Sequence, residues 1–312
     1  MTYLKNANIE RLRIIASYGI ICFHTQDGIF KLIGYAGLPI FIMITFSFGT
    51  IKQAHSLNEK ERTLFRNYLL SKTNRLIIPY LFWVFIYWCW GCARMLSSHG
   101  EIINVPVTIL LPLYGTSIHL WYIPFIFIGL IAVSFTKLYF PLKSLFSISL
   151  YLFLSLLTGL LPVFVQNTNQ LPLPIPQFLF ALPALFLGLT ISDTMDVNKP
   201  LKYCLILLII SLIGAIRLLL NSNDSFLFLY LLSFLLVVTM QNIPGKIDSF
   251  TKQLSPLTFG IYLIHPIIAA IIVNIATITN FQRIAPINSI IIFISSAICI
   301  YILKKTTLEK YV

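Results

Sequence analysis

Long apolar stretches separated by short polar segments recur from one end of the chain to the other. Most of them are close to the ~20 residues that an α-helix needs to cross the hydrocarbon core of a bilayer. We expect ten spans, at residues 11–29, 35–51, 76–97, 117–136, 144–165, 177–192, 201–219, 225–241, 256–279 and 285–303. The pattern therefore predicts an all-α, polytopic membrane protein in which about ten transmembrane helices form one bundle.

Two connecting segments have patterns of their own. Residues 58–71 carry many charges, with apolar residues at helical spacing, which indicates a helix lying on the cytoplasmic surface of the membrane. Residues 102–115 are short and apolar and contain two prolines, which favours a re-entrant or interfacial piece on the outer side.

The composition agrees with this class. Hydrophobic residues make up 58% of the 312 residues and charged residues only 10%, whereas a soluble domain is about 25% charged. No polar block is long enough to fold in water, so we expect one membrane domain over residues 1–312. The five cysteines lie in apolar stretches, and the Cys89-x-x-Cys92 pair has no second pair of ligands near it. We therefore predict neither a disulfide framework nor a metal site.

The net charge of +12 is explained by membrane topology. In a soluble protein this charge would suggest a nucleic acid partner. With the N-terminus in the cytoplasm, however, 18 of the 22 lysines and arginines fall in cytoplasmic segments, as the positive-inside rule expects. We therefore predict that both termini are cytoplasmic, that the protein is a multi-pass protein of the plasma (inner) membrane, and that it binds no nucleic acid.

Polar residues inside the first span mark the candidate site. Arg13 and His24 lie eleven positions apart, which is almost a whole number of helical turns. Their side chains should therefore share one helix face, roughly 16 Å apart along the axis. Ionisable groups within a membrane helix are costly and usually functional, so we expect this face to point into the bundle and to carry the chemistry.

Several motifs, in a fixed order, resemble those of one family. They are Arg13-x10-His24, the Gly37–Gly49 stretch, Lys72-x-x-Arg75 leading into Pro79, His119-x-Trp121, and Ser255–Pro266 with Tyr262 and His265. Together they resemble the membrane acyltransferase 3 family, whose members O-acylate cell-surface carbohydrates. The resemblance implies a ten-helix domain that moves an acyl group, usually acetyl from acetyl-CoA, to a sugar hydroxyl. One position departs from the family pattern, because Lys72 stands where an arginine is expected and lacks the bidentate guanidinium fork.

His24 is the candidate general base. Imidazole titrates near neutrality, and acyl transfer requires removal of a hydroxyl proton as the carbonyl is attacked. Asp27 follows three residues later and is predicted to orient the imidazole from the same helix face. Two alternatives stay open: His24 as a packing histidine with only a structural hydrogen bond, and Asp27 as a residue of the outer headgroup region.

Arg13, Lys72 and Arg75 fall at the cytoplasmic ends of the first and third spans. Fixed positive charge there suits the phosphates of coenzyme A. The alternative is that these residues are ordinary flanking charges of the positive-inside kind.

Four further residues are candidates for binding the acceptor. His119 and Trp121 open the fourth span on the outer side, and Tyr262 and His265 lie three apart on one face of the ninth. Pro266 follows His265, so a kink is expected to free a backbone carbonyl near it. The competing interpretations are a membrane-interface role for Trp121 and a structural hydrogen bond between helices for the Tyr262–His265 pair.

The sequence thus favours an integral membrane O-acyltransferase that uses acyl-CoA, with acetyl-CoA as the expected donor, and no permanently bound cofactor. The acceptor would be a hydroxyl of a surface polysaccharide or of its lipid-linked precursor. No nucleophilic serine motif is evident, which favours direct transfer, although an acyl-histidine stays open. The alternative functions are a transporter or flippase of a lipid-linked sugar and a membrane scaffold without chemistry.

Overall fold

The computed structural model describes residues 6–50, 59–99, 110–140, 144–164, 171–193, 226–278 and 285–312. This part of the chain is helical and contains no strand. Its elements are α1 (Ala7–Thr25), α2 (Gly28–Tyr35), α3 (Gly37–Gly49), α4 (Glu59–Lys72), the π-helix η1 (Thr73–Ile77), α5 (Ile78–His99), α6 (Leu111–Tyr114), the 3-10 helix η2 (Ile118–Trp121), α7 (Tyr122–Tyr139), α8 (Ser144–Phe164), α9 (Ile175–Asp193), α11 (Phe226–Asn242), α12 (Ser249–Leu254), the 3-10 helix η5 (Ser255–Leu257), α13 (Thr258–Ile278), α14 (Ala285–Leu303) and the 3-10 helix η6 (Glu309–Tyr311).

The all-α class is confirmed, and a helix covers most of each expected span that falls within the described residues. The expected span at 201–219 lies outside them. Five helical segments of the described chain are long and apolar enough to cross a membrane: Gly28–Gly49, Arg62–Leu96, Ile118–Tyr139, Ile175–Asp193 and Ser249–Ile275. Large apolar side chains stay exposed on the outer helices, for example Ile290, Ile294 and Ile298 along one stripe of α14, as contact with lipid requires. The count of ten spans and the orientation of the termini stay predictions.

The first helix ends earlier than the sequence pattern indicates. We expected one span over 11–29, but α1 stops at Thr25, and Gly28 begins α2 with φ of +61°. Only glycine adopts this backbone conformation without strain, so the chain reverses here. α2 then packs back against α1 so closely that a Cβ atom on Gly34 would lie 2.5 Å from the Gly19 carbonyl oxygen. Small residues thus bring the two helices together, as is common between membrane helices.

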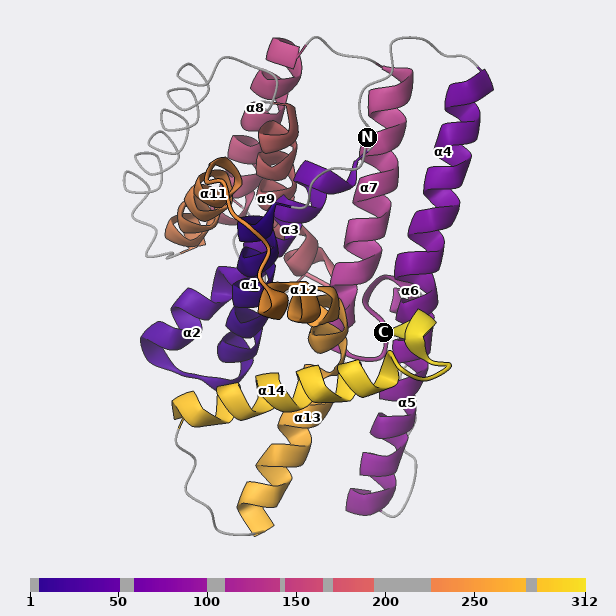
Figure 1. The fold of residues 1–312 in the computed structure, drawn as a ribbon, viewed down its shortest axis with the longest axis vertical. Coiled ribbons are helices and arrows are strands. Elements are labelled where there is room, and N and C mark those ends of the chain that lie inside the picture. The colour runs from indigo at the N-terminus through magenta and orange to yellow at the C-terminus, as the bar shows by residue number, and fades with distance from the viewer. Residues whose placement is uncertain are drawn as a thin grey trace.

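Residues 58–71, which we expected to lie along the membrane surface, instead continue the axis of the next long helix from residue 59 onward. Figure 1 shows α4 continuing along the axis of α5 through the π-helical turn η1, so that the three elements form one long rod. The rod packs along α7, where the Phe65 ring lies 6.1 Å from that of Phe135. It also contacts the end of α3, where the Tyr68 hydroxyl donates to the Gly49 carbonyl (2.8 Å). The charged segment is a helix, as predicted, but it extends the bundle instead of lying across its end.

The central helix α3 is held by α9 on one side and by α11 on another. The Ser47 hydroxyl is buried and donates to the carbonyls of Met43 (2.7 Å) and Gly188 (2.9 Å), which satisfies a polar group inside the apolar core. On the other side, the Ser233 hydroxyl donates to the Ala36 carbonyl (3.1 Å).

The N-terminal end of α1 is fixed by polar contacts with the segment that precedes α12. The Asn8 amide donates to the Ile243 carbonyl (2.9 Å), and the Arg11 guanidinium pairs with Asp248 (2.7 Å). Asp248 also caps α12 by accepting from the Thr251 backbone N–H (2.8 Å). The Thr251 N–H and then the Arg11 guanidinium hold the pKa of Asp248 well below its usual range.

The last long helix is steeply inclined to the rod. Figure 1 shows α14 running across the molecule in front of α13, instead of alongside α5 and α7. The Tyr18 ring meets Phe293 edge to face at 5.7 Å, which places α14 directly against α1. The chain then turns back toward α5, where the Trp83 indole N–H donates to the Tyr311 carbonyl (3.0 Å).

Candidate active site

Three histidines from three separate elements come together at one end of α1. His24 lies in the last turn of α1, His119 in η2 and His265 within α13. The ring centroids of His24 and His265 are 5.5 Å apart, and those of His119 and His265 are 5.9 Å apart. His119 and His265 are buried, whereas His24 is exposed. The structure therefore brings together three of the residues that the sequence singled out, and His24 is the exposed one of the three.

Tyrosines surround the two buried imidazoles and fix them. The Tyr262 hydroxyl donates to the His119 carbonyl, and the Tyr87 hydroxyl donates to the Leu263 carbonyl (2.8 Å). The Tyr87 ring also lies 4.8 Å from the His119 ring, edge to face. On its other side, the His119 Nδ1 atom lies 3.0 Å from the Ser117 hydroxyl. Together these contacts tie η2, α5 and α13 around the imidazoles.

The proline after His265 has the predicted local effect. In a regular helix the N–H of residue 266 would donate to the carbonyl of residue 262, but Pro266 has no N–H. The freed Tyr262 carbonyl lies 2.8 Å from the His265 Nδ1 atom, which bonds to it instead. The Nε2 atoms of His119 and His265 are both buried and have no hydrogen-bond partner among the described residues.

Asp27 is not placed as we expected. The prediction put it on the same helix face as His24, three residues later, but α1 has already ended at Thr25. Asp27 is exposed in the turn and occupies the N-cap position of α2 without a capping hydrogen bond from its side chain. The charged side chain that acts electrostatically on His24 is that of Lys31 in α2. The early turn removes the geometric basis for the proposed pair, and the orienting role of Asp27 stays a prediction.

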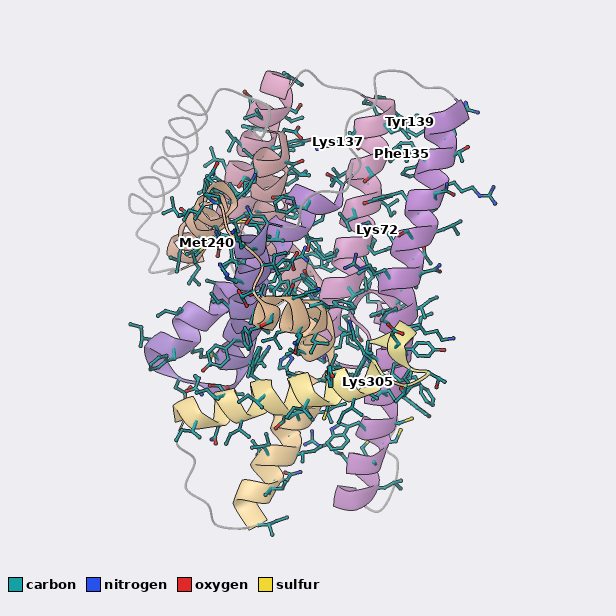
Figure 2. All side chains as sticks on the ribbon, in the orientation of Figure 1. Lys72, Phe135, Lys137, Tyr139, Met240 and Lys305 are labelled. Carbon is teal, nitrogen blue, oxygen red and sulfur yellow. The ribbon has the colours of Figure 1, made fainter. Side chains whose placement is uncertain are left out.

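Positive charges gather at the opposite end of α1. Arg13 lies 3.4 and 3.5 Å from the two carboxylate oxygens of Glu10, which also accepts a hydrogen bond from the Ser255 hydroxyl. Arg13 and Arg75 both lie within electrostatic range of Lys72. Figure 2 shows Lys72 where the α4–α5 rod faces α7. The three predicted cofactor-binding cations thus form one group, although they come from α1, α4 and η1.

Tyr122 lies between the histidine cluster and the cationic group. It begins α7 and is buried. Its ring lies 5.2 Å from that of Tyr262, and the Arg13 charge acts on its hydroxyl. Because α1 is one unbroken helix from Ala7 to Thr25, Arg13 and His24 lie on one face of it, as their spacing predicted, and the His24 ring meets His265 of α13.

Trp121 is the predicted substrate residue whose ring has no direct contact with an imidazole among the described residues; it reaches them only through Tyr122 (6.3 Å). It is buried, and its ring packs against Phe125 (6.0 Å) and Phe178 (6.1 Å), between α7 and α9. Its role in stacking on a sugar stays a prediction.

Sequence reasoning did not assign a role to several residues that complete the site. Glu10 is buried beside Arg13, and its position three residues before Arg13, on the same side of a helix, was a usable signal. Lys304 donates to the Pro256 carbonyl (2.8 Å), next to Ser255, and lies within electrostatic range of Arg75. Tyr87 is one of many aromatic residues of α5, and no pattern distinguished it from the others.

Comparison with known proteins identifies one matching family. The family described as an acyltransferase domain matches the chain over residues 6–305, which includes both ends of α1 and all three clustered histidines. No curated protein and no solved structure matches the chain.

Proposed function

Because the chain belongs to the membrane acyltransferase 3 family, we propose that it is an O-acyltransferase that moves an acyl group, acetyl in the first instance, from acyl-CoA to a carbohydrate hydroxyl. The acceptor is a cell-surface polysaccharide or its lipid-linked precursor. The observation that carries this proposal is the convergence of His24, His119 and His265 at one end of α1, with Arg13, Lys72 and Arg75 grouped at the other.

The imidazole end supplies the proton transfer. His24 takes the proton of the acceptor hydroxyl as the hydroxyl oxygen attacks the thioester carbonyl carbon. The carbon–sulfur bond then breaks, and the thiolate of coenzyme A leaves and receives the proton from His24. Because His24 is exposed while its two partners are buried, it is the imidazole that a large carbohydrate can reach.

The cationic end holds the donor. The phosphates of coenzyme A are polyanionic, and grouped guanidinium and ammonium groups bind phosphate through charge-assisted hydrogen bonds. Arg13 supplies the planar fork, and Lys72 adds a point charge in place of the arginine that the family pattern expects. The axial separation of Arg13 and His24 is roughly the length of the pantetheine arm of coenzyme A. Tyr122 lies between the cationic and imidazole ends, where that arm would pass.

Two contacts between helix ends support the expected topology, because each contact joins segments that are predicted to lie on the same side of the membrane. The N-terminal end of α1 contacts the segment before α12, and Lys137 near the end of α7 pairs with Asp193 at the end of α9 (2.6 Å). The predicted topology places each of these pairs on the cytoplasmic side. The cationic group would then face the cytoplasm, where acyl-CoA is made, and His24 would lie toward the outer side.

The experiment is transfer of labelled acetyl from acetyl-CoA to envelope carbohydrate in membranes that contain the protein. We expect an alkali-labile ester label with the wild type, and a loss of about 10²-fold or more for His24→Ala. His99→Ala, the same substitution at the end of α5, is the control and should retain activity. Full activity of a normally expressed His24→Ala variant would remove His24 from the mechanism. Movement of lipid-linked sugar without transfer of label would indicate a flippase instead.

A further inference from the structure

The contact between His265 and Tyr262 determines which nitrogen of His265 carries the proton. A carbonyl oxygen only accepts hydrogen bonds, so the His265 Nδ1 atom, 2.8 Å from the Tyr262 carbonyl, must be the donor. In a neutral imidazole only one nitrogen carries a proton. The Nε2 atom of His265 therefore presents a lone pair, and the missing N–H of Pro266 is what leaves the Tyr262 carbonyl free to impose this tautomer.

That lone pair needs a donor. The His265 side chain is fully buried, and its Nε2 atom has no hydrogen-bond partner among the described residues. Buried acceptors are nearly always paired, because an unpaired one loses its hydration without compensation. We therefore expect an N–H or O–H group near His265 to turn toward Nε2 and donate a hydrogen bond to it.

His24 is the group best placed to supply it. The two rings are 5.5 Å apart between centroids and inclined by 35°. Two imidazole radii of about 1.1 Å each and an N···N distance of about 3.0 Å give nearly the same separation, so a small rotation of the exposed His24 ring completes the bond. The His119 ring is farther away, at 5.9 Å. It is also buried and held between Ser117 and Tyr87, so it is less free to turn toward Nε2.

We propose that His265 is the positioning residue of the catalytic base, acting through His24. This inference rests on the proposed acyl transfer. The His265 Nε2 atom accepts a hydrogen bond from one N–H of His24 and thereby leaves the other His24 nitrogen unprotonated toward the acceptor hydroxyl. When His24 takes the hydroxyl proton and becomes an imidazolium, the same hydrogen bond stabilises its charge. His265 thus performs the orienting task for which the sequence suggested Asp27.

Two amide substitutions separate this role from a structural one. Glutamine reaches as far as the Nε2 position and can place its carbonyl oxygen there as an acceptor. Asparagine reaches only the Nδ1 position, so it keeps a donor for the Tyr262 carbonyl but presents no acceptor to His24. We expect His265→Gln to retain kcat within about tenfold of the wild type and His265→Asn to lose about 10²-fold, with the KM for acetyl-CoA nearly unchanged in both.

The His265→Gln and His265→Asn substitutions are then compared in a His24→Ala background, with every variant checked for expression. If His265 acts through His24, the difference between Gln and Asn disappears there, because coupled residues are not additive. A His265→Asn variant that equals or exceeds His265→Gln would overturn the proposal, since it would show that only the bond to Tyr262 matters. A difference that persists without His24 would overturn it as well. Wild-type membranes that transfer no acyl group would overturn the proposed function itself, a result distinct from either of these.

Discussion

The two ends of α1 differ in how their functional groups are held. At the imidazole end, the buried rings of His119 and His265 have defined partners, and their elements are tied together by tyrosine hydroxyls. At the cationic end, Arg75 is exposed and the Arg13–Glu10 ion pair is long, at 3.4 Å. Glu10 is a single carboxylate beside a group of three cations, Arg13, Lys72 and Arg75. In the proposed mechanism, the imidazole end is preorganised for proton transfer, whereas the cationic end has an excess of positive charge that a polyanion would neutralise.

If this comparison is right, changes at the cationic end act on donor binding and changes at the imidazole end act on turnover. The largest effect on binding is expected for Arg13→Ala. Loss of its bidentate contact with phosphate should raise the KM for acetyl-CoA about 10- to 100-fold, with a smaller change in kcat. Initial rates over a range of donor concentration measure this. Lys305→Ala, which removes an exposed lysine beside the Tyr301 ring, is the control and should leave KM unchanged. A fall in kcat alone for Arg13→Ala would place Arg13 in the chemistry instead.

At the imidazole end, Pro266→Ala should lower kcat by about tenfold. The alanine N–H would restore the helical hydrogen bond to the Tyr262 carbonyl and compete with His265 Nδ1 for it. Pro286→Ala, near the start of α14, is a matched substitution outside the site. Equal kcat for Pro266→Ala and the wild type would mean that the freed carbonyl has no role in orienting His265.

A smaller effect of opposite sign is expected for Glu10→Gln. The Glu10 carboxylate occupies Arg13 when no donor is bound, and so it competes with phosphate for the guanidinium. A neutral amide competes less, so the KM for acetyl-CoA should fall about two- to fivefold. A higher KM would show that Glu10 holds Arg13 in its binding position.

The smallest expected effect concerns stability and involves Asp248, which belongs to neither the imidazole end nor the cationic end. The pKa of Asp248 is lower in the folded state than in the unfolded state, because the Thr251 N–H and Arg11 favour its charged form. Its contribution to stability is therefore present above the ordinary aspartate pKa of about 4 and is lost as the pH falls below it. Thermal unfolding in detergent should show Asp248→Asn to be less stable than the wild type at pH 7, with the difference shrinking in acid. A difference independent of pH would contradict this assignment.

Local patterns in the sequence predicted the parts of the site that depend on one helix at a time. The spacing of Arg13 and His24 placed both on one face of α1, where the His24 ring meets His265 of α13. The His265-Pro266 step likewise predicted a freed carbonyl, which the structure shows at Tyr262. Each of these follows from helical periodicity or from the missing N–H of proline.

Contacts between distant segments could not be predicted in this way. The hydrogen bond from Ser255 to Glu10 joins residues 245 positions apart, and a single sequence contains no signal for that pairing. The continuous α4–α5 rod was missed because the charges of α4 suggest a surface position, while packing against α7 decides its direction. The end of α1 at Thr25 had a local signal in Gly28, but the apolar run beyond it outweighed that signal in the prediction.

In the proposed mechanism, one donor molecule spans α1, with its phosphates at Arg13 and its thioester at His24. The most direct measurement compares acetyl-CoA with S-acetylpantetheine, which carries the same thioester but no phosphate, in the Arg13→Ala and His24→Ala variants. We expect Arg13→Ala to lower kcat/KM strongly with acetyl-CoA and hardly at all with S-acetylpantetheine, and His24→Ala to lower it with both donors. An Arg13→Ala defect of equal size with the two donors would show that Arg13 does not bind the phosphates of the donor.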